Sequence, residues 1–376
     1  MGAGPAGTSL AAVLARRGWD VLVLEQRASL GHKVCGEFMS WEAQSTLRAL
    51  GLLAGVQAAR PTLLARAVLT SRSGLAAGFD LARGSWGLSR KSLDTALADE
   101  ARAAGAELSM GVRVQRFDQV SDGYAVEARS NGRAIEVRCR ALIVACGRSS
   151  SSELPPRSQS APEAGLVGIK RHYQNVRMPP QVELYFFEGG YIGLAPIEGG
   201  SVNLCLLASR NALEGAHKDP AELIETLSGR IHGIGNRLAG SEALDTSPLA
   251  VAPIDLWRRA EPWDSVACIG DAAGVIPPLT GDGIASALRS VELCAPLANA
   301  YLSGDLTLEG WEQAYRSRWH ESFDRPIAIA RKLETWLGSA VGSDLLLGVG
   351  SILPPIARRL AALTRTRATS APPFMT

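Results

Sequence analysis

The chain has 376 residues, enough for about two domains with buried cores. Hydrophobic residues make up 46% of it and charged residues 20%, a balance typical of globular α/β proteins and unlike that of disordered or fibrous chains. The formal net charge is only +2, and no basic run is interleaved with aromatic residues, so nucleic acid is excluded as the main partner.

The first predicted elements follow a glycine-rich run of the form GxGxxG. Helix-forming residues 8–17 come after this run, and an apolar strand over residues 21–24 ends on Glu25. In a dinucleotide-binding βαβ unit, the first glycine permits a tight turn, the second lets the backbone approach a pyrophosphate, and the third lets the helix pack on the sheet. The predicted cofactor-binding residues of this run are Gly2, Gly4, Ala6 and Gly7.

Glu25 stands where a carboxylate can accept hydrogen bonds from both ribose hydroxyls of an adenosine. This favours FAD or NAD over NADP, whose 2′-phosphate the carboxylate would repel. A GxGxxG run normally follows a buried apolar strand, but only Met1 precedes it here. We therefore expect the first strand to be absent from this chain, because of a late start or a truncation, with a tolerated deletion as the least favoured explanation.

The next segments alternate between helix and strand. A polar loop covers residues 31–40, and a helix opens at residues 88–94 and runs to residue 104. Arg90 in its first turn is either a solvated charge or a group lying over cofactor phosphates. Strand patterns follow at residues 106–108 and 112–114, and alternation at 124–128 and 135–139 predicts a small antiparallel ribbon.

Two buried strands each end in a glycine turn. The first covers residues 141–145 before Gly147, and the second covers residues 265–269 before Gly270 and Asp271. Residues 277–285, with Gly281 and Gly283, then lead into a long helix.

These segments together resemble the family of FAD-dependent oxidoreductases that includes the geranylgeranyl reductases and, more distantly, aromatic hydroxylases of the para-hydroxybenzoate hydroxylase type. The resemblance covers nearly the whole chain. It implies that Asp271 bonds the ribityl chain of FAD, and that Gly281, Gly283 and Ile284 lie at the flavin edge, where a helix end stabilises the anionic reduced ring. Further cofactor contacts expected from the resemblance are Val34, Cys35, Glu37, Arg90 and Val114.

The resemblance also separates branches of the family. Residues 190–204 lack the paired tryptophans of flavin halogenases, so halogenation is disfavoured. Cys146 precedes Gly147 where the hydroxylases carry Asp-Gly, which weakens an assignment to the hydroxylase branch. Cys35 is a candidate catalytic proton donor, with simple packing as the alternative.

The predicted fold is α/β, with a Rossmann-like FAD/NAD(P)-binding domain, an antiparallel-sheet substrate domain and a helical C-terminal segment. The discontinuous FAD-binding domain is assigned to residues 1–60, 85–155 and 255–300, and the substrate domain to residues 61–84 and 156–254. Residues 301–376 form the helical segment. The tryptophans between Trp311 and Trp319, at helical spacing with Tyr315, are expected to serve packing.

Cysteine and histidine usage points away from metal chemistry. The six cysteines, Cys35, Cys139, Cys146, Cys205, Cys268 and Cys294, form no CxxC pair, and no signal peptide is recognisable. We expect reduced cytoplasmic thiols that mostly fill the core. The histidines, His32, His172, His217, His232 and His320, show no ligand spacing and are expected to be surface or satisfied polar residues.

No apolar run is long enough to span a membrane, but residues 336–363 are unusually apolar. A short helical hairpin packed on the body is favoured there over a peripheral membrane contact, which stays open.

The predicted function is that of an FAD-dependent oxidoreductase acting on a hydrophobic small molecule, an isoprenoid, a lipid or an aromatic polyketide. Because there is no second GxGxxG, a transiently docked NAD(P)H or another donor is expected to reduce the flavin. Monooxygenase and alkene reductase remain open as reaction types. The alternative is a flavin-binding protein with little or no turnover because its N-terminal strand is missing.

Overall fold

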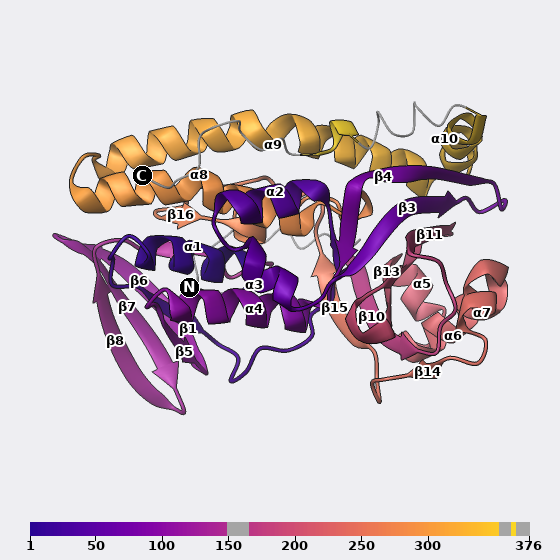
Figure 1. Ribbon diagram of the computed structural model, residues 1–376, viewed down its shortest axis with the longest axis horizontal. Helices are drawn as coiled ribbons and strands as arrows, with labels where there is room; N and C mark the ends of the chain where they lie inside the picture. The colour runs from indigo at the N-terminus through magenta and orange to yellow at the C-terminus, as the bar shows by residue number, and fades with distance from the viewer. Residues whose placement is uncertain (149–164, 353–361, 366–376) are drawn as a thin grey trace.

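The computed structural model describes residues 1–148, 165–352 and 362–365. Figure 1 shows two halves side by side, with α1–α4 and the β6–β8 sheet in one and a large sheet in the other. The long helices α8 and α9 run along one side of the molecule. Parts of all three predicted regions lie outside the described residues: 149–155 of the FAD-binding domain, 156–164 of the substrate domain, and 353–361 and 366–376 of the helical segment.

The helices begin at positions close to those expected, and several follow a recognisable N-cap. Ser89 caps α4 by accepting the amide of Ser92, and Thr307 caps α9 by accepting the amide of Gly310. The helices are α1 (Pro5–Ala15), α2 (Trp41–Ala49), α3 (Leu53–Ala58), α4 (Arg90–Ala103), α5 (Arg210–Glu214), α6 (Pro220–Arg230), α7 (His232–Leu238), α8 (Gly283–Ser303), α9 (Leu308–Gly338) and α10 (Ala340–Ile352).

Two parallel strand pairs lie on either side of the chain start. They are β1 (Leu22–Glu25) with β5 (Glu107–Met110), and β9 (Ile143–Val144) with β16 (Ala267–Cys268). Residues 1–4, before α1, form no assigned strand, yet the amide of Gly2 donates to Leu24 O at 2.8 Å and the amide of Ala145 donates to Met1 O at 2.8 Å. The first two residues therefore pair with both neighbouring strands, which keeps those backbone groups satisfied.

A three-stranded antiparallel sheet covers the outer side of this half. Its strands are β6 (Val112–Val120), β7 (Gly123–Ser130) and β8 (Arg133–Cys139). The predicted ribbon over residues 124–139 is thus present, with β6 as a third strand.

The other half is a nine-stranded sheet in the order β14-β10-β13-β12-β11-β3-β4-β2, with β15 also paired to β10. All pairs are antiparallel except β11 with β3. The strands are β2 (Phe38–Met39), β3 (Thr62–Thr70), β4 (Ala76–Gly87), β10 (Leu166–Gln174), β11 (Gln181–Phe187), β12 (Gly190–Pro196), β13 (Val202–Ser209), β14 (Glu242–Ala243) and β15 (Leu249–Ile254). Residues 61–84 and 166–254 therefore build one sheet, and β2 ties the N-terminal segment to it.

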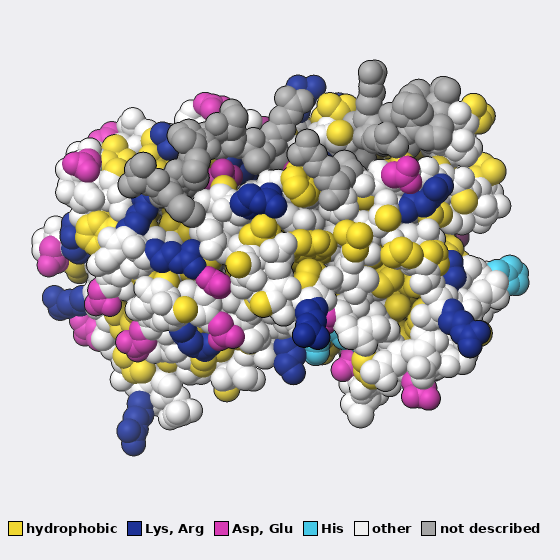
Figure 2. All heavy atoms as spheres, in the orientation of Figure 1, with side chains coloured by type: hydrophobic (Ala, Val, Ile, Leu, Met, Phe, Trp, Pro, Cys, Tyr) yellow, Lys and Arg dark blue, Asp and Glu magenta, His cyan; other side chains and the backbone are white. Residues whose placement is uncertain are grey.

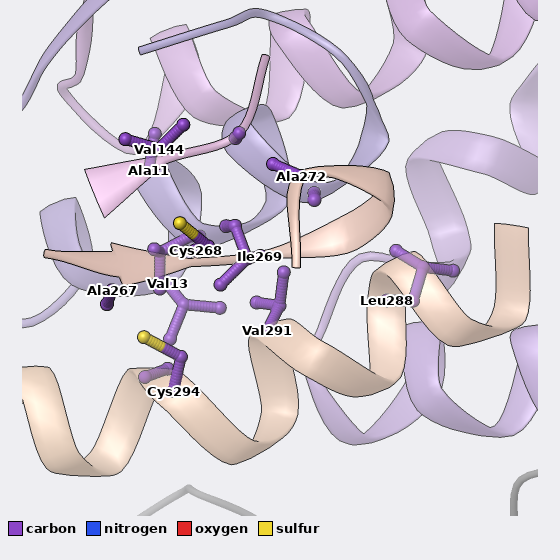
Figure 3. Close-up of a cluster of buried hydrophobic side chains, with 14 of the residues drawn as sticks. Ala11, Val13, Val144, Ala267, Cys268, Ile269, Ala272, Leu288, Val291 and Cys294 are labelled. Carbon is purple, nitrogen blue, oxygen red and sulfur yellow. The ribbon is translucent and has the colours of Figure 1, made fainter. Parts of the chain in front are cut away.

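The largest core lies between α1, the β9–β16 pair and α8. Figure 3 shows Ala11 and Val13 from α1 meeting Val144 of β9 and Val291 of α8, with Cys268 between them. Trp311, Tyr315 and Trp319 of α9 are at most 2% exposed and belong to the same cluster, which confirms their packing role. Burial of such large aromatic side chains is a main source of the stability of this half.

Candidate functional site

A cavity of about 920 Å³ lies between the two halves. Its walls come from the start of α1, the end of β1, the loop over residues 31–37, β11–β13, β15, the start of α8, and helices α9 and α10. This volume is near the upper end for small-molecule sites, so it suits a large ligand or two ligands side by side.

All but one of the residues predicted for the site line this cavity. They are Gly2, Gly4, Ala6, Glu25, Val34, Cys35, Glu37, Arg90, Val114, Asp271, Gly281, Gly283 and Ile284. The exception is Gly7, where a Cβ atom would come within 1.9 Å of Gly2 O. Gly7 thus allows α1 to pack against the chain start and does not itself line the cavity.

The N-terminus of α1 opens into the cavity without a side-chain cap. Gly4 is its N-cap residue, and no acidic side chain lies in the first turn. The free amides and the helix dipole favour an anion there. The Arg90 guanidinium lies 4.0 Å from the position that a Gly4 Cβ would occupy, which adds a positive charge beside these amides.

Arg90 is held by a bidentate ion pair with Asp94, with both N···O distances at 3.0 Å. The Asp94 side chain is fully buried and also accepts from Lys33 at 2.9 Å. Burial opposes the charged form of Arg90, but the Asp94 carboxylate raises the pKa of Arg90 above its ordinary value. Arg90 therefore stays charged and fixed in direction.

Glu25 is only 7% exposed, at the end of β1. Its Oε2 accepts the amide of Ala3 at 2.8 Å, and its Oε1 accepts the amide of Arg27 at 3.0 Å. Because each carboxylate oxygen has a second lone pair, both can still accept a ligand hydroxyl.

At the α8 end of the cavity, Gly281 has a φ of +67°. A Cβ there would lie 2.7 Å from Phe38 Cδ1, so the close approach requires glycine. A Cβ at Gly283 would meet no described atom within 4 Å, and the α8 N-terminus has no side-chain cap. Arg148 bridges this region, with Nε 3.6 Å from Asp271 Oδ2 and a hydrogen bond to Val34 O at 3.4 Å.

These features fit FAD. Two helix N-termini without side-chain caps, a buried carboxylate with free acceptor positions and an ordered arginine face one cavity, as an extended dinucleotide with a pyrophosphate requires.

Sequence reasoning missed a buried charge network around Glu37, which is 0% exposed. Its carboxylate accepts from Lys170, from His172 Nε2 at 2.6 Å and from the amide of Arg90 at 2.6 Å. Burial alone would raise the pKa of Glu37, but the His172 hydrogen bond and the Lys170 charge lower it below 4.5. Partners more than 130 residues away leave no local sequence signal.

His32 packs edge-on against His172, with 4.8 Å between ring centroids, and its Nδ1 has no hydrogen-bond partner among the described residues. The sequence predicted a surface or satisfied polar residue, whereas His32 is half-buried and this nitrogen is unsatisfied. His32, Glu37 and His172 bring three possible metal-ligand atoms within 4.8 Å of one another. Lys170 already compensates the Glu37 charge, so the cluster is explained as an ion network.

Three of the six cysteines, Cys35, Cys146 and Cys205, line the cavity and do not only fill the core. The Glu37 amide donates to Cys35 Sγ at 3.4 Å, and Asn203 Nδ2 donates to Cys35 O at 3.0 Å, so the backbone and sulfur of this loop are fixed. Burial raises the pKa of the Cys205 thiol to about 12, so it remains protonated.

The side of the cavity formed by β3, β11–β13, α9 and α10 is largely apolar. Its wall includes Leu69, Leu184, Leu207, Leu337 and Leu347, which belong to one hydrophobic cluster with Tyr191. Such a surface favours a hydrophobic ligand.

The two halves of the molecule also differ in the side chains on their surface. In Figure 2, side chains of both charges are interspersed over the half that carries α1–α4, and hydrophobic side chains gather over β3, β4 and β15. No helix in the described ranges has the length and hydropathy needed to cross a membrane.

The chain is similar in sequence to known flavoproteins and reductases. A family model described as "FAD binding domain" matches residues 1–314. Digeranylgeranylglycerophospholipid reductase 2 of Methanopyrus kandleri is 27% identical over 352 residues, which is 88% of this chain and 84% of that protein. Menaquinone reductase of Mycolicibacterium smegmatis is 28% identical over 354 residues, 89% of this chain and 82% of that protein.

Among solved structures, a geranylgeranyl bacteriochlorophyll reductase-like protein from Thermoplasma acidophilum superposes with a TM-score of 0.69 at 21% identity, covering 96% of this chain and 97% of that one. At this identity the likeness concerns the fold alone.

Proposed function

Since the chain belongs to the family of proteins with an FAD binding domain and is an FAD-dependent oxidoreductase, we propose that it reduces carbon–carbon double bonds of a hydrophobic, isoprenoid-type substrate, with NAD(P)H as electron donor. The observation that carries the proposal is the continuity of the cavity. The glycine-rich end, at Gly4 and Glu25, and the apolar side, at Leu184 and Leu337, line one and the same cavity. The names of the two relatives, both reductases, support reduction over hydroxylation.

Each end of the cavity has a distinct task in this proposal. Gly2, Gly4, Ala6 and Arg90 would hold the pyrophosphate, and Glu25 would hold the adenosine ribose. The other predicted cofactor contacts, Val34, Cys35, Glu37, Val114, Asp271, Gly281, Gly283 and Ile284, would surround the flavin end. When bound and reduced by NAD(P)H, FAD supplies the hydride for one alkene carbon, while the second carbon takes a proton.

The protein's part is to position the substrate, exclude water and supply that proton. The apolar wall around Leu207 and Leu347 would exclude water from the reacting bond. Cys35 Sγ is the proposed proton donor, oriented by the Glu37 amide.

The test is turnover under argon and under air, with geranylgeraniol as the probe and NADPH or NADH as donor. The proposal predicts a product that gains two hydrogen atoms without oxygen. A hydroxylated product formed only in air would contradict it and favour a monooxygenase. FAD retention without turnover of geranylgeraniol or of menaquinone would favour the alternative of a flavin-binding protein with little activity.

The peripheral membrane contact is a second part of the proposal, carried by α10. This helix lines the cavity through Leu346, Leu347 and Val349. It also exposes Val341 at 80% and Ile352 at 78%, which are high values for aliphatic side chains. An apolar, partly exposed helix that also lines a large cavity suits a substrate that is drawn from a bilayer.

Sedimentation with phosphatidylglycerol vesicles tests this contact. We expect wild type to sediment with the vesicles and Val341→Ser to remain largely in solution. Leu63→Ser, at an exposed apolar position on β3, serves as the control. Equal binding of wild type and Val341→Ser would contradict the contact.

A further inference from the structure

We infer that Asn203 is a positioning residue, which sets where the Cys35 thiol lies in the cavity by binding the Cys35 carbonyl. The consequence for proton delivery rests on the proposed function, in which Cys35 is the proton donor. Asn203 is not among the residues predicted for the site, and it does not itself line the cavity.

Three consecutive carbonyl groups of the cavity loop, at residues 33–35, are each bound by a side chain from elsewhere in the chain. The pairs are Lys33 O with Lys170 Nζ at 3.3 Å, Val34 O with Arg148 Nη2 at 3.4 Å, and Cys35 O with Asn203 Nδ2 at 3.0 Å. Two of these donors lie on β10 and β13 of the large sheet, 137 and 168 positions from their acceptors. The loop is therefore positioned by a sheet that follows it at a great distance in the chain.

Asn203 has a defined place inside this sheet. β13 lies between β10 and β12, and Asn203 pairs in register with His172 on one side and Ala195 on the other. Alternation along the strand puts Asn203 on the same face as Cys205 and Leu207, which line the cavity. The donor to the Cys35 carbonyl is thus held by backbone pairing on both sides.

The Asn203 amide is buried with only one end in use. Asn203 is 1% exposed, and its Oδ1 has no hydrogen-bond partner among the described residues. Turning the amide over would place Oδ1 against Cys35 O, and two acceptors cannot bond to each other. A buried acceptor without a partner lowers stability, so an apolar side chain would suit this strand position better if Asn203 served packing alone.

The backbone after Cys35 links the carbonyl contact to the sulfur. Glu37 has a φ of +55°, a left-handed conformation that costs free energy in a residue other than glycine. Its buried carboxylate holds it there through Lys170 and His172. In this conformation, the Glu37 amide donates to Cys35 Sγ at 3.4 Å. Cys35 is therefore held at its carbonyl by Asn203 and at its sulfur by Glu37.

Asn203 is the one of these three donors whose removal changes no charge. Lys170 also pairs with Glu37, and Arg148 lies 3.6 Å from Asp271, so replacing either would alter the charges around the cavity. Asn203→Leu keeps a similar side-chain size and removes the bond to Cys35 O.

The matched control is Gln44, another buried amide that donates to a backbone carbonyl. It is 4% exposed, and its Nε2 lies 3.2 Å from Gly84 O. Neither Gln44 nor Gly84 lines the cavity. Gln44→Leu therefore removes the same kind of bond at a place without contact to Cys35.

The first experiment needs no turnover. It measures how fast iodoacetamide alkylates each cysteine of the purified protein, by peptide mass spectrometry. Asn203→Leu should change the rate at Cys35 by at least about threefold and leave the rate at Cys146, which also lines the cavity, as in wild type. Gln44→Leu should change neither rate. Equal Cys35 rates in wild type and Asn203→Leu would overturn the inference, and so would equal changes at Cys35 and Cys146.

The second experiment follows reoxidation of the NADPH-reduced protein by geranylgeraniol under argon. In this step the alkene gains a hydride and the Cys35 proton, and solvent restores the thiol. We expect Asn203→Leu to slow the step by about tenfold at saturating geranylgeraniol, with KM, FAD content and the rate of reduction by NADPH unchanged.

A double-mutant cycle separates positioning from a general structural effect. In a Cys35→Ala background, Asn203→Leu should slow the same step by no more than about twofold, because the group that it positions is absent. A tenfold loss in that background as well would overturn the inference. If Asn203→Leu does not fold, Asn203→Ala, which removes the amide without a branched side chain, takes its place in both experiments with the same expectations.

The proposed function and the inference fail in different ways. A wild-type protein that does not reduce geranylgeraniol would refute the proposed function, and a Cys35→Ala variant with the wild-type rate would refute Cys35 as proton donor. In either case, the alkylation rates still decide whether Asn203 positions the Cys35 thiol.

Discussion

Glu37 is the residue on which most of the buried charge in the site converges. Removing its charge in Glu37→Gln leaves the Lys170 ammonium, which is 2% exposed, without a counter-charge from any residue of the described ranges. Breaking one partner of a buried pair costs about 3–5 kcal/mol, so we expect a loss of that size in the free energy of unfolding, measured by urea denaturation near neutral pH.

The pH dependence of the same variant follows from the sign of the pKa shift. The folded pKa of Glu37 lies below its ordinary value of 4.5, so the network stabilises the fold above that pH and the contribution is lost as the pH falls through the folded value. The difference in the free energy of unfolding between wild type and Glu37→Gln should therefore become smaller as the pH falls below the folded pKa of Glu37. Glu136→Gln, at an exposed position on β8, should change neither stability nor its pH profile.

The pKa of Glu334 on α9 is shifted in the opposite direction to that of Glu37. Burial raises the pKa of Glu334 to about 7, and its Oε2 has no hydrogen-bond partner among the described residues. Between pH 4.5 and about 7 the folded state keeps a proton that the unfolded chain releases, so Glu334 destabilises the fold progressively as the pH rises through this range.

We expect Glu334→Gln to be more stable than wild type by on the order of 2 kcal/mol at about pH 8, and about equal to it near pH 4. Urea denaturation at a series of pH values measures this difference. A gain that is the same at every pH would show that the effect is not one of titration.

At the scale of elements, Gly7 near the start of α1 and Gly283 at the start of α8 should have different roles: Gly7 permits packing, whereas Gly283 leaves room for a ligand. Gly7→Ala would push a methyl group into Gly2 O, so we expect it to destabilise the protein by about 1–3 kcal/mol even without FAD. Gly283→Ala meets no described atom, so its stability without FAD should match wild type while its FAD affinity falls. Thermal unfolding and FAD titration of both variants test the pair, and loss of stability in Gly283→Ala would contradict the open space there.

These elements also show which features of the site could be predicted from the sequence and which could not. Gly2, Gly4 and Glu25 could be predicted because the turn, helix and strand they require lie within 25 consecutive residues. The 281–284 segment could be predicted for the same reason, as a turn before a long helix. By contrast, Lys170 and His172, two partners of Glu37, lie on β10, and Arg365, one partner of Asp282, lies near the C-terminus. Each of these contacts depends on tertiary packing that no local pattern encodes. The glycine motif also could not predict that Met1 and Gly2 pair with both β1 and β9, because the motif normally follows a full strand.

For the molecule as a whole, the cavity joins the two halves, so the cofactor should stabilise both together. Its walls combine the start of α1 and β1 with β11–β13 and α9, segments far apart in the chain. A ligand that binds only the folded state adds about 2.7 kcal/mol at a hundredfold excess over its Kd. We therefore expect FAD to raise the melting temperature in a single transition, followed by intrinsic tryptophan fluorescence, because Trp86 packs against the main core from β4 and Trp263 is buried within it.

FMN, which lacks the adenosine half, is the matched ligand control for this effect. Glu25 and the α1 N-terminus lie at the adenosine and pyrophosphate end, so FMN should stabilise the protein less than FAD at equal concentration. Glu25→Gln should narrow the difference in stabilisation between FAD and FMN, because it weakens the contact to the ribose and removes an acceptor from the amide of Ala3 or Arg27 beside the α1 N-terminus. If FMN and FAD stabilise wild type equally, the dinucleotide assignment of this end of the cavity is wrong, whatever the flavin end binds.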